Sequence, residues 1–118
     1  MGPLWESELP DDAWAVRCGL NALETLRKRV EECYVAKGHY GLSVFSLAGA
    51  TVEQIIQASQ LRKRAQVLQC TMIGAIRFAL GCSVEQTASN GHSSVRFATN
   101  PTDEELERFA RLFVMLDG

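Results

Sequence analysis

Residues 84–97 read V-E-Q-T-A-S-N-G-H-S-S-V-R-F, and this stretch is the strongest short-range structural signal in the chain. Asn90–Gly91 is a dipeptide preferred in type I′ turns, which join two antiparallel strands through a two-residue loop. With that loop, one face of the hairpin is mainly apolar and the other is polar, as in a half-buried hairpin. The predicted register pairs Val84 with Phe97, Glu85 with Arg96 and Gln86 with Val95.

Three more strands and four helices are expected around this hairpin. The segments 14–20, 40–47 and 66–70 alternate in polarity or are apolar over the length of a strand. Three of the four expected helices begin with a capping-box spacing. Glycines that favour the left-handed conformation end the first and the third helix. The expected caps are Asn21 with Glu24, Thr51 with Gln54 and Thr102 with Glu105, while Thr71 is expected to cap the remaining helix.

The order of these elements predicts an α/β (α+β) fold. We expect a single-domain mixed sheet of about five strands with a C-terminal hairpin, covered by about four helices. Strands and helices alternate before the hairpin, and helical crossovers usually join parallel strands, so some parallel pairs are expected. Residues 13–118 form the predicted domain. Residues 1–12 contain four acids, no base and two prolines, and they are expected to form a flexible acidic arm.

Composition excludes several classes of protein. The longest apolar stretch is about half of the roughly 20 residues that span a bilayer, so no membrane association is expected. The acidic N-terminus is unlike a signal peptide, which favours a cytoplasmic location. The four cysteines form no C-x-x-C pair, so they are expected to be free, buried thiols and not metal ligands. No nucleotide-cofactor motif is present, so no cofactor is expected.

The charge distribution favours a binding domain. Residues 13–100 carry ten bases and five acids, between two acidic ends. We therefore expect a small binding or regulatory domain that engages a macromolecular partner, a protein or a nucleic acid, without catalysis. The partner-binding residues predicted are Arg62, Lys63, Arg64, Arg27 and Lys28, because the run 62–64 is the densest basic cluster and the other two bases could extend it.

A small toxin-like enzyme acting on RNA or a nucleotide is the second hypothesis, with His39, His92, Arg17 and Ser43 as its catalytic residues. Histidine pairs often act as acid and base on phosphodiesters. The segment H-S-S-V at residues 92–95 resembles the H-x-S/T-hydrophobic motif of two-histidine phosphoesterases. That family has two such motifs, whereas the sequence from His39 reads H-Y-G-L-S.

Two further resemblances involve the segments around Arg17 and Ser43. These segments resemble the arginine and serine strands of ADP-ribosyltransferases, which implies a glutamate on a later strand, here Glu85. The segments V-R-C-G-L and Y-G-L-S-V-F also resemble small bacterial proteins of unknown function. A self-assembling structural subunit, that is, a homo-oligomer, is the third hypothesis for this chain.

Overall fold

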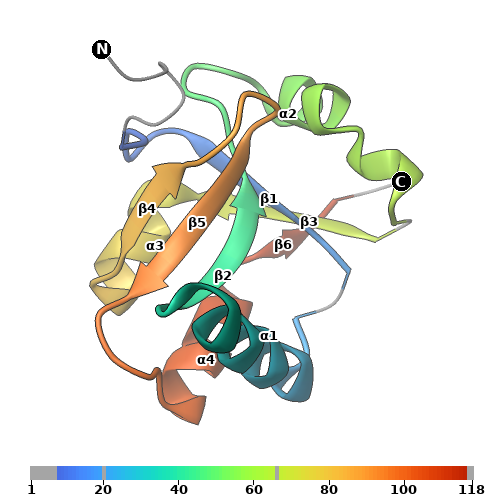
Figure 1. Cartoon of the computed structure of the whole chain (residues 1–118). Helices are drawn as coiled ribbons and strands as arrows, with labels where there is room; N and C mark the ends of the chain where they lie inside the picture. Colours follow the sequence, from blue (N-terminus) through green and yellow to red (C-terminus); the bar gives the residue numbers. More distant parts are fainter. Residues whose placement is uncertain (1–7, 20, 66, 117–118) are drawn as a thin grey trace.

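The computed structural model describes residues 8–19, 21–65 and 67–116, which contain six strands, four α-helices and one 3-10 helix (Figure 1). The prediction of a single α/β domain with about four helices is confirmed, with one strand more than expected. In chain order the elements are β1 (Trp14–Cys18), α1 (Leu23–Lys37), β2 (Tyr40–Phe45), α2 (Val52–Ser59), η2 (Leu61–Lys63), β3 (Leu68–Met72), α3 (Ile73–Leu80), β4 (Ser83–Gln86), β5 (His92–Phe97), α4 (Asp103–Arg111) and β6 (Val114–Met115).

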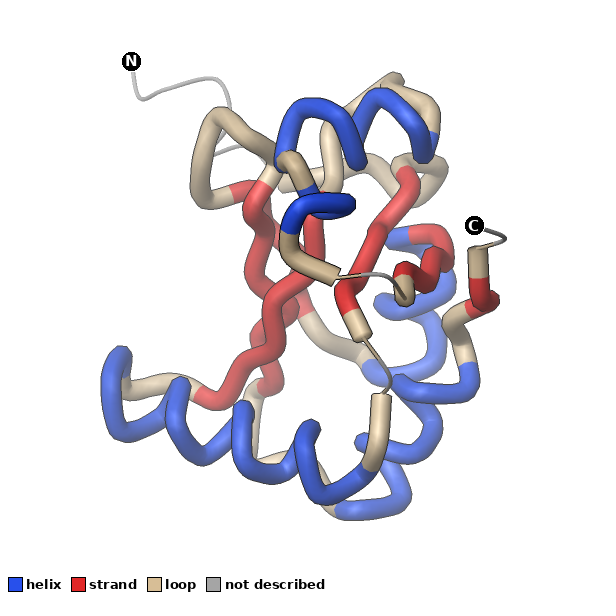
Figure 2. Tube along the Cα trace, turned by 90° about the vertical axis from the view of Figure 1, so that its right-hand side faces the viewer, coloured by secondary structure: helices blue, strands red, loops and turns tan. Residues whose placement is uncertain are grey.

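The strands form one sheet in the order β4-β5-β2-β1-β3-β6, and every pair in its described residues is antiparallel. The expected parallel pairs are therefore wrong. Figures 1 and 2 show the reason: α1 crosses the end of the sheet instead of returning along its length. Strand β2 consequently starts at the end where β1 finishes and runs back beside it. Alternation in the sequence does not distinguish these two helix paths.

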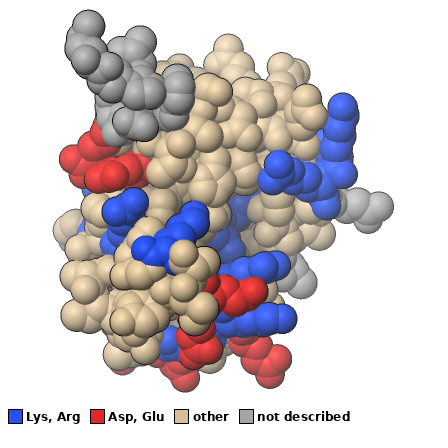
Figure 3. All heavy atoms as spheres, viewed as in Figure 1, with Lys and Arg blue, Asp and Glu red and all other residues tan. Residues whose placement is uncertain are grey.

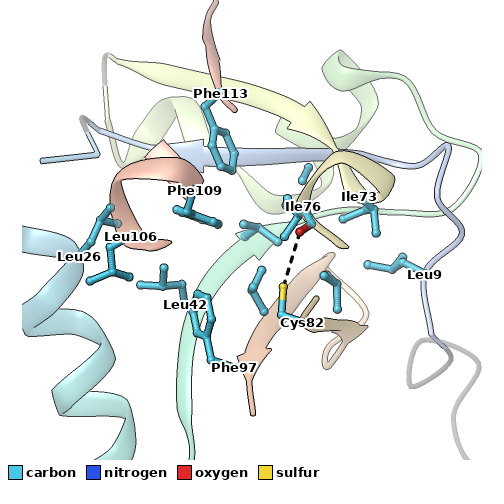
Figure 4. Close-up of a cluster of buried hydrophobic side chains, with 14 of the residues drawn as sticks. Leu9, Leu26, Leu42, Ile73, Ile76, Cys82, Phe97, Leu106, Phe109 and Phe113 are labelled. Atoms are coloured by element: carbon cyan, nitrogen blue, oxygen red, sulfur yellow. Dashed lines mark hydrogen bonds between the residues drawn. The ribbon is translucent and has the colours of Figure 1, made fainter. Parts of the chain in front are cut away.

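Each face of the sheet has its own apolar core. The larger core lies between the sheet and α1, α3 and α4, and Figure 4 shows it centred on Phe109, Ile76 and Leu42. The smaller core lies on the opposite face, where Ile55 and Ile56 of α2 pack against Val16 and other strand residues. Because successive strand residues point to opposite faces, Ala15 joins the first core and Val16 the second.

The β4–β5 hairpin forms with a different turn from the one predicted. Val84 faces Val95, and not Phe97, so the predicted register and the Glu85–Arg96 pairing are wrong. A type I′ turn needs two positive φ angles, and here Gly91 has one (+96°) while Asn90 does not. The loop is longer, because the amides of Thr87 and Ala88 both donate to the carbonyl of His92. The shift is two residues, so the same side chains stay buried.

The helix boundaries follow capping chemistry in part. Thr51 and Thr102 each form the complete predicted capping box, and Gly38 and Gly81 end α1 and α3 in the left-handed conformation. The caps expected at Asn21 and Thr71 are wrong. Helix α1 begins after Ala22 without a side-chain cap. The side-chain oxygen of Asn21, Oδ1, accepts a hydrogen bond from Arg17 instead. Thr71 lies within β3.

Both ends of the described chain join the sheet. Residues 1–7 of the predicted arm lie outside the described residues, but Leu9 is buried in the larger core and Glu8 forms a bridge with Glu85 of β4. Residues 8–12 therefore pack on the domain instead of forming part of a flexible arm. At the other end, α4 stops at Arg111 and the following residues form β6 beside β3. This is the strand that the sequence pattern missed.

Candidate functional site

A basic cleft of about 490 Å³ opens between α1 and the sheet face that carries Ser43. Basic side chains gather on this face above α1 in Figure 3. Gly41, Ser43 and Phe45 of β2 form its floor, because alternate residues of a strand point to the same side. The residues that line this basic cleft are Arg17, Cys18, Arg29, Glu32, Cys33, Lys37, Gly41, Leu42, Ser43, Phe45, Arg64 and Ser94.

Arg17 occupies the gap where β1 leaves β2. In the described residues these two strands pair only at Val16 and Phe45, which leaves the Ser43 carbonyl without a strand partner. The Arg17 guanidinium donates to that carbonyl and, from Nε, to the side chain of Asn21 at 2.9 Å. Its guanidinium carbon lies 5.3 Å from the centre of the Phe109 ring. Burial lowers the pKa of Arg17 to about 10, so the side chain still carries its positive charge at neutral pH.

The floor of the basic cleft depends on a glycine. A Cβ at Gly41 would lie 3.0 Å from the Val95 carbonyl oxygen and 3.4 Å from the Cys33 sulfur. Only a residue without a side chain therefore lets α1 approach β2 this closely. Further along the floor, the guanidinium carbon of Arg64 lies 5.6 Å from the Phe45 ring centre. The His92 ring meets the same phenyl ring edge-on at 5.5 Å.

Ser43, His92 and Thr87 form a hydrogen-bonded row beside the basic cleft. The Ser43 hydroxyl lies 3.1 Å from His92 Nε2, and the Thr87 hydroxyl lies 2.7 Å from His92 Nδ1. Thr87 also donates to the carbonyl of His92 at 3.1 Å. Burial lowers the pKa of His92, and the charges of Lys37 and Arg64 lower it further. His92 is therefore neutral at pH 7 and can accept a proton.

The structure separates the two histidines that were predicted to act together. His39 lies just before β2, six residues from Phe45, the residue that pairs with His92. At the rise of an extended strand the Cα atoms of the two histidines are about 20 Å apart. The His39 ring leans over Gly41, where its Cδ2 atom is 3.4 Å from the position of a Cβ, but it forms no hydrogen bond with Ser43 or His92 in the described residues. Burial lowers the pKa of His39, as do the charges of Arg96 and Lys37. Of the four predicted catalytic residues, the structure thus brings together Arg17, Ser43 and His92, but not His39.

The predicted partner-binding residues also separate. Arg62 forms an ion pair with Glu53 at 3.1 Å, which offsets one of the three charges of the run 62–64. Arg27 lies in the interface of α1 and α4, where it binds Asp103, Asn100 and the Pro101 carbonyl. Lys63 and Lys28 are exposed and do not line the basic cleft, whereas Arg64 does.

Sequence reasoning missed Lys37 and Thr87, and it considered Arg29 only as an extension of the basic run 62–64. Arg29 and Lys37 lie eight residues apart on α1, close to the 7.2 residues of two helical turns, so helical periodicity would have placed them on one face. Thr87 carried no signal, because only the longer hairpin loop brings it against His92. Cys18 and Cys33 are half-buried in the basic cleft, whereas Cys70 and Cys82 are buried as expected, and all four thiols are free.

The remaining features concern metal binding, membrane spanning and exposed apolar side chains. Within residues 8–19, 21–65 and 67–116, no three His, Cys, Asp or Glu side chains come close enough to hold a metal ion. No helix of that part of the chain has the length and apolar character needed to cross a bilayer. Exposed apolar side chains surround β3 and the edge strand β6, and self-assembly of the chain would use this surface. They are Trp14, Met72, Val114 and Met115.

Comparison with protein-family models, with curated proteins and with solved structures finds no match for this chain. The function must therefore be inferred from the chemistry of the basic cleft.

Proposed function

We propose that this domain binds single-stranded nucleic acid through the basic cleft. One observation carries the proposal: four bases and one acid line a single concave site. The bases are Arg17, Arg29, Lys37 and Arg64, which come from separate parts of the chain and converge from both sides of the floor. Phosphate oxygens are the groups that such a set of cations recognises.

The charges that line the basic cleft favour an anionic ligand, although the whole protein has a net charge of -2. Glu32, the acid in the lining, lies 3.7 Å from Arg29 and offsets one of the four charges. The remaining three have no carboxylate among the ion pairs of the described residues. A concave wall of low dielectric concentrates their field, so the site attracts anions although the whole molecule is acidic.

The size of the basic cleft selects a single strand. Its volume of about 490 Å³ is that of a small-molecule site, which accepts one or two nucleotides and not the rigid backbone of a duplex. The Phe45 ring in the floor is buried and lies beneath the Arg64 guanidinium, so it holds that cation over the basic cleft.

Fluorescence anisotropy with a labelled single-stranded RNA of mixed sequence tests this proposal. Binding should weaken as salt increases, with a log–log slope no steeper than about -3, because each neutralised phosphate contributes roughly -0.7. The double variant Lys37→Gln/Arg64→Gln should bind at least about tenfold more weakly than the wild type, since two of the cleft charges are lost. Both side chains are exposed, so the fold should be unaffected.

Arg111→Gln is the matched control, because Arg111 is an exposed base on α4 that does not line the cleft. If Arg111→Gln weakened binding as much as the cleft variants, net charge alone would explain the affinity and the proposal would fail. Tighter binding of an acidic peptide than of RNA would assign the cleft to a protein partner and would also contradict the proposal.

A cytoplasmic location is part of the same proposal. All four thiols are free, and two of them lie half-exposed in the basic cleft. Free thiols persist in a reducing compartment, where nucleic acid is also available.

A further inference from the structure

We infer that Ser43 and His92 form a nucleophile–base pair that cleaves a phosphodiester bond of the strand held in the basic cleft. This inference rests on the proposed function and adds a reaction to it. It is carried by the positions of three side chains, Ser43, His92 and Thr87, and by the hydrogen bonds that join them.

The nucleophile and the base lie on neighbouring strands. Ser43 of β2 is exposed on the floor of the basic cleft, and His92 of β5 lies one strand away on the same face. The register sets His92 opposite Phe45, which brings its Nε2 diagonally to 3.1 Å from the Ser43 hydroxyl oxygen. This distance lies within the range for a nucleophile and its general base.

Thr87 contacts the ring nitrogen of His92 that does not face Ser43. The Thr87 hydroxyl lies 3.1 Å from the carbonyl oxygen of His92, which also accepts from the amides of Thr87 and Ala88. At 2.7 Å from Nδ1, the same hydroxyl oxygen can accept the Nδ1 proton of the imidazole. In that tautomer Nε2 has a lone pair that points to Ser43 and can take the hydroxyl proton. A hydroxyl nucleophile, an imidazole base and an orienting acceptor are the three parts of a serine hydrolase site.

The cations of the basic cleft supply the remaining requirement. Lys37 and Arg64 are near enough to His92 to lower its pKa, so they also lie near a phosphorus atom that Ser43 could attack. Charge on the non-bridging oxygens is stabilised by such cations as the transition state forms. Arg17 acts as a positioning residue, because it holds the backbone carbonyl of Ser43.

The reaction balances with water as its only co-reactant. The Ser43 oxygen forms a bond to phosphorus while its proton moves to His92 Nε2. The bond from phosphorus to the ester oxygen of the leaving nucleoside breaks, and His92 returns the proton to that oxygen. A water molecule then gives a proton to His92 while its oxygen bonds to the phosphorus of the Ser43 phosphodiester. The bond from phosphorus to the Ser43 oxygen breaks, His92 returns the proton to that oxygen, and the strand leaves with a terminal 3′ or 5′ phosphate.

A neutral fluorophosphonate probe tests the nucleophile without nucleic acid. Its phosphorus bonds to an activated serine oxygen as fluoride leaves, and mass spectrometry locates the adduct. We expect the adduct on Ser43, none in Ser43→Ala, and labelling at least about 100-fold slower in His92→Gln, in line with the loss of a general base. Thr87→Val should label at a rate between those of the wild type and His92→Gln.

Two controls and a pH profile separate this role from a structural one. Ser89→Ala and His39→Gln should label like the wild type, because Ser89 is an exposed loop residue and His39 forms no hydrogen bond with Ser43 or His92 in the described residues. The labelling rate should rise with a midpoint below 6.5, since burial, Lys37 and Arg64 lower the pKa of His92. Equal labelling of several serines, or no effect of His92→Gln, would overturn the inference.

The second assay is hydrolysis of an end-labelled single-stranded RNA and of a DNA of the same sequence. Cleavage of both, lost in Ser43→Ala, is expected, because the nucleophile belongs to the protein and no 2′-hydroxyl is needed. Labelling of Ser43 without cleavage would overturn the phosphodiester reaction. Tight RNA binding without labelling would overturn the inference and leave the proposed function intact, whereas labelling without RNA binding would overturn the proposed function.

Discussion

At the scale of the residue, Arg27 shows how a basic side chain can belong to the fold. Its guanidinium donates to Asn100 at 2.8 Å, to Pro101 at 2.6 Å and to Asp103 at 2.9 Å, which joins α1 to the start of α4. Arg27→Gln should lower the free energy of unfolding by about 1–2 kcal/mol, because partly buried charge-assisted hydrogen bonds are lost. Urea denaturation measures this change. Lys28→Gln, one residue along on the exposed side, should change it by less than about 0.5 kcal/mol, and equal losses would contradict the assignment.

The same scale sets the limit of what the sequence could predict about the site. His92 could be selected because the chain has 2 histidines, and Ser43 and Arg17 because the strands around them resemble those of ADP-ribosyltransferases. Their proximity could not be predicted, because it depends on the β2–β5 register and on the gap between β1 and β2. Thr87 needed the loop conformation as well, since a two-residue turn would have directed its side chain along the hairpin and not against the imidazole.

At the scale of the element, the capping boxes are the most predictable feature, because each involves a contact within four residues. Thr102 accepts from the amide of Glu105 at 3.1 Å, and the Glu105 side chain accepts from the amide of Thr102 at 2.9 Å. Thr102→Ala should therefore lower the stability by about 1 kcal/mol in urea denaturation. Glu104→Gln, which alters charge in the same turn but keeps the capping box, should leave the hydrogen exchange of the Glu105 amide unchanged. If Thr102→Ala left both stability and exchange unchanged, the box would contribute nothing.

Elements whose position depends on distant parts of the chain were less predictable. The length and stop signals of α1 are local, but its path across the end of the sheet follows from packing against α4. Strand β6 is two exposed residues, Val114 and Met115, and only the adjacent edge of β3 gives it a partner. Phe113 and Leu116 on either side of it continue the helical spacing of Leu106 and Phe109, so helical periodicity extends the predicted last helix across β6.

At the scale of the whole molecule, the two histidines link folding to pH. His92 faces Lys37 and Arg64 with Ser43 and Thr87 as its hydrogen-bonding partners, and His39 faces Arg96 and Lys37. In each case burial is the largest cause that lowers the pKa below the value of about 6.5 for an unfolded chain. The unfolded state therefore binds more protons than the folded state just below pH 6.5. Stability is complete above that pH and decreases as the pH falls towards the lowered folded values.

This linkage predicts that urea denaturation midpoints decrease between pH 7.5 and pH 5. The double variant His39→Gln/His92→Gln should lose less stability over the same interval, because its two positions no longer titrate. Each single variant should show an intermediate dependence, since the two imidazoles share no hydrogen bond in the described residues. If the wild type and the double variant lost the same stability on acidification, groups other than these histidines would control the pH dependence. A wild type that became more stable on acidification would contradict the lowered pKa values, and with them the neutral His92 on which the proposed base depends.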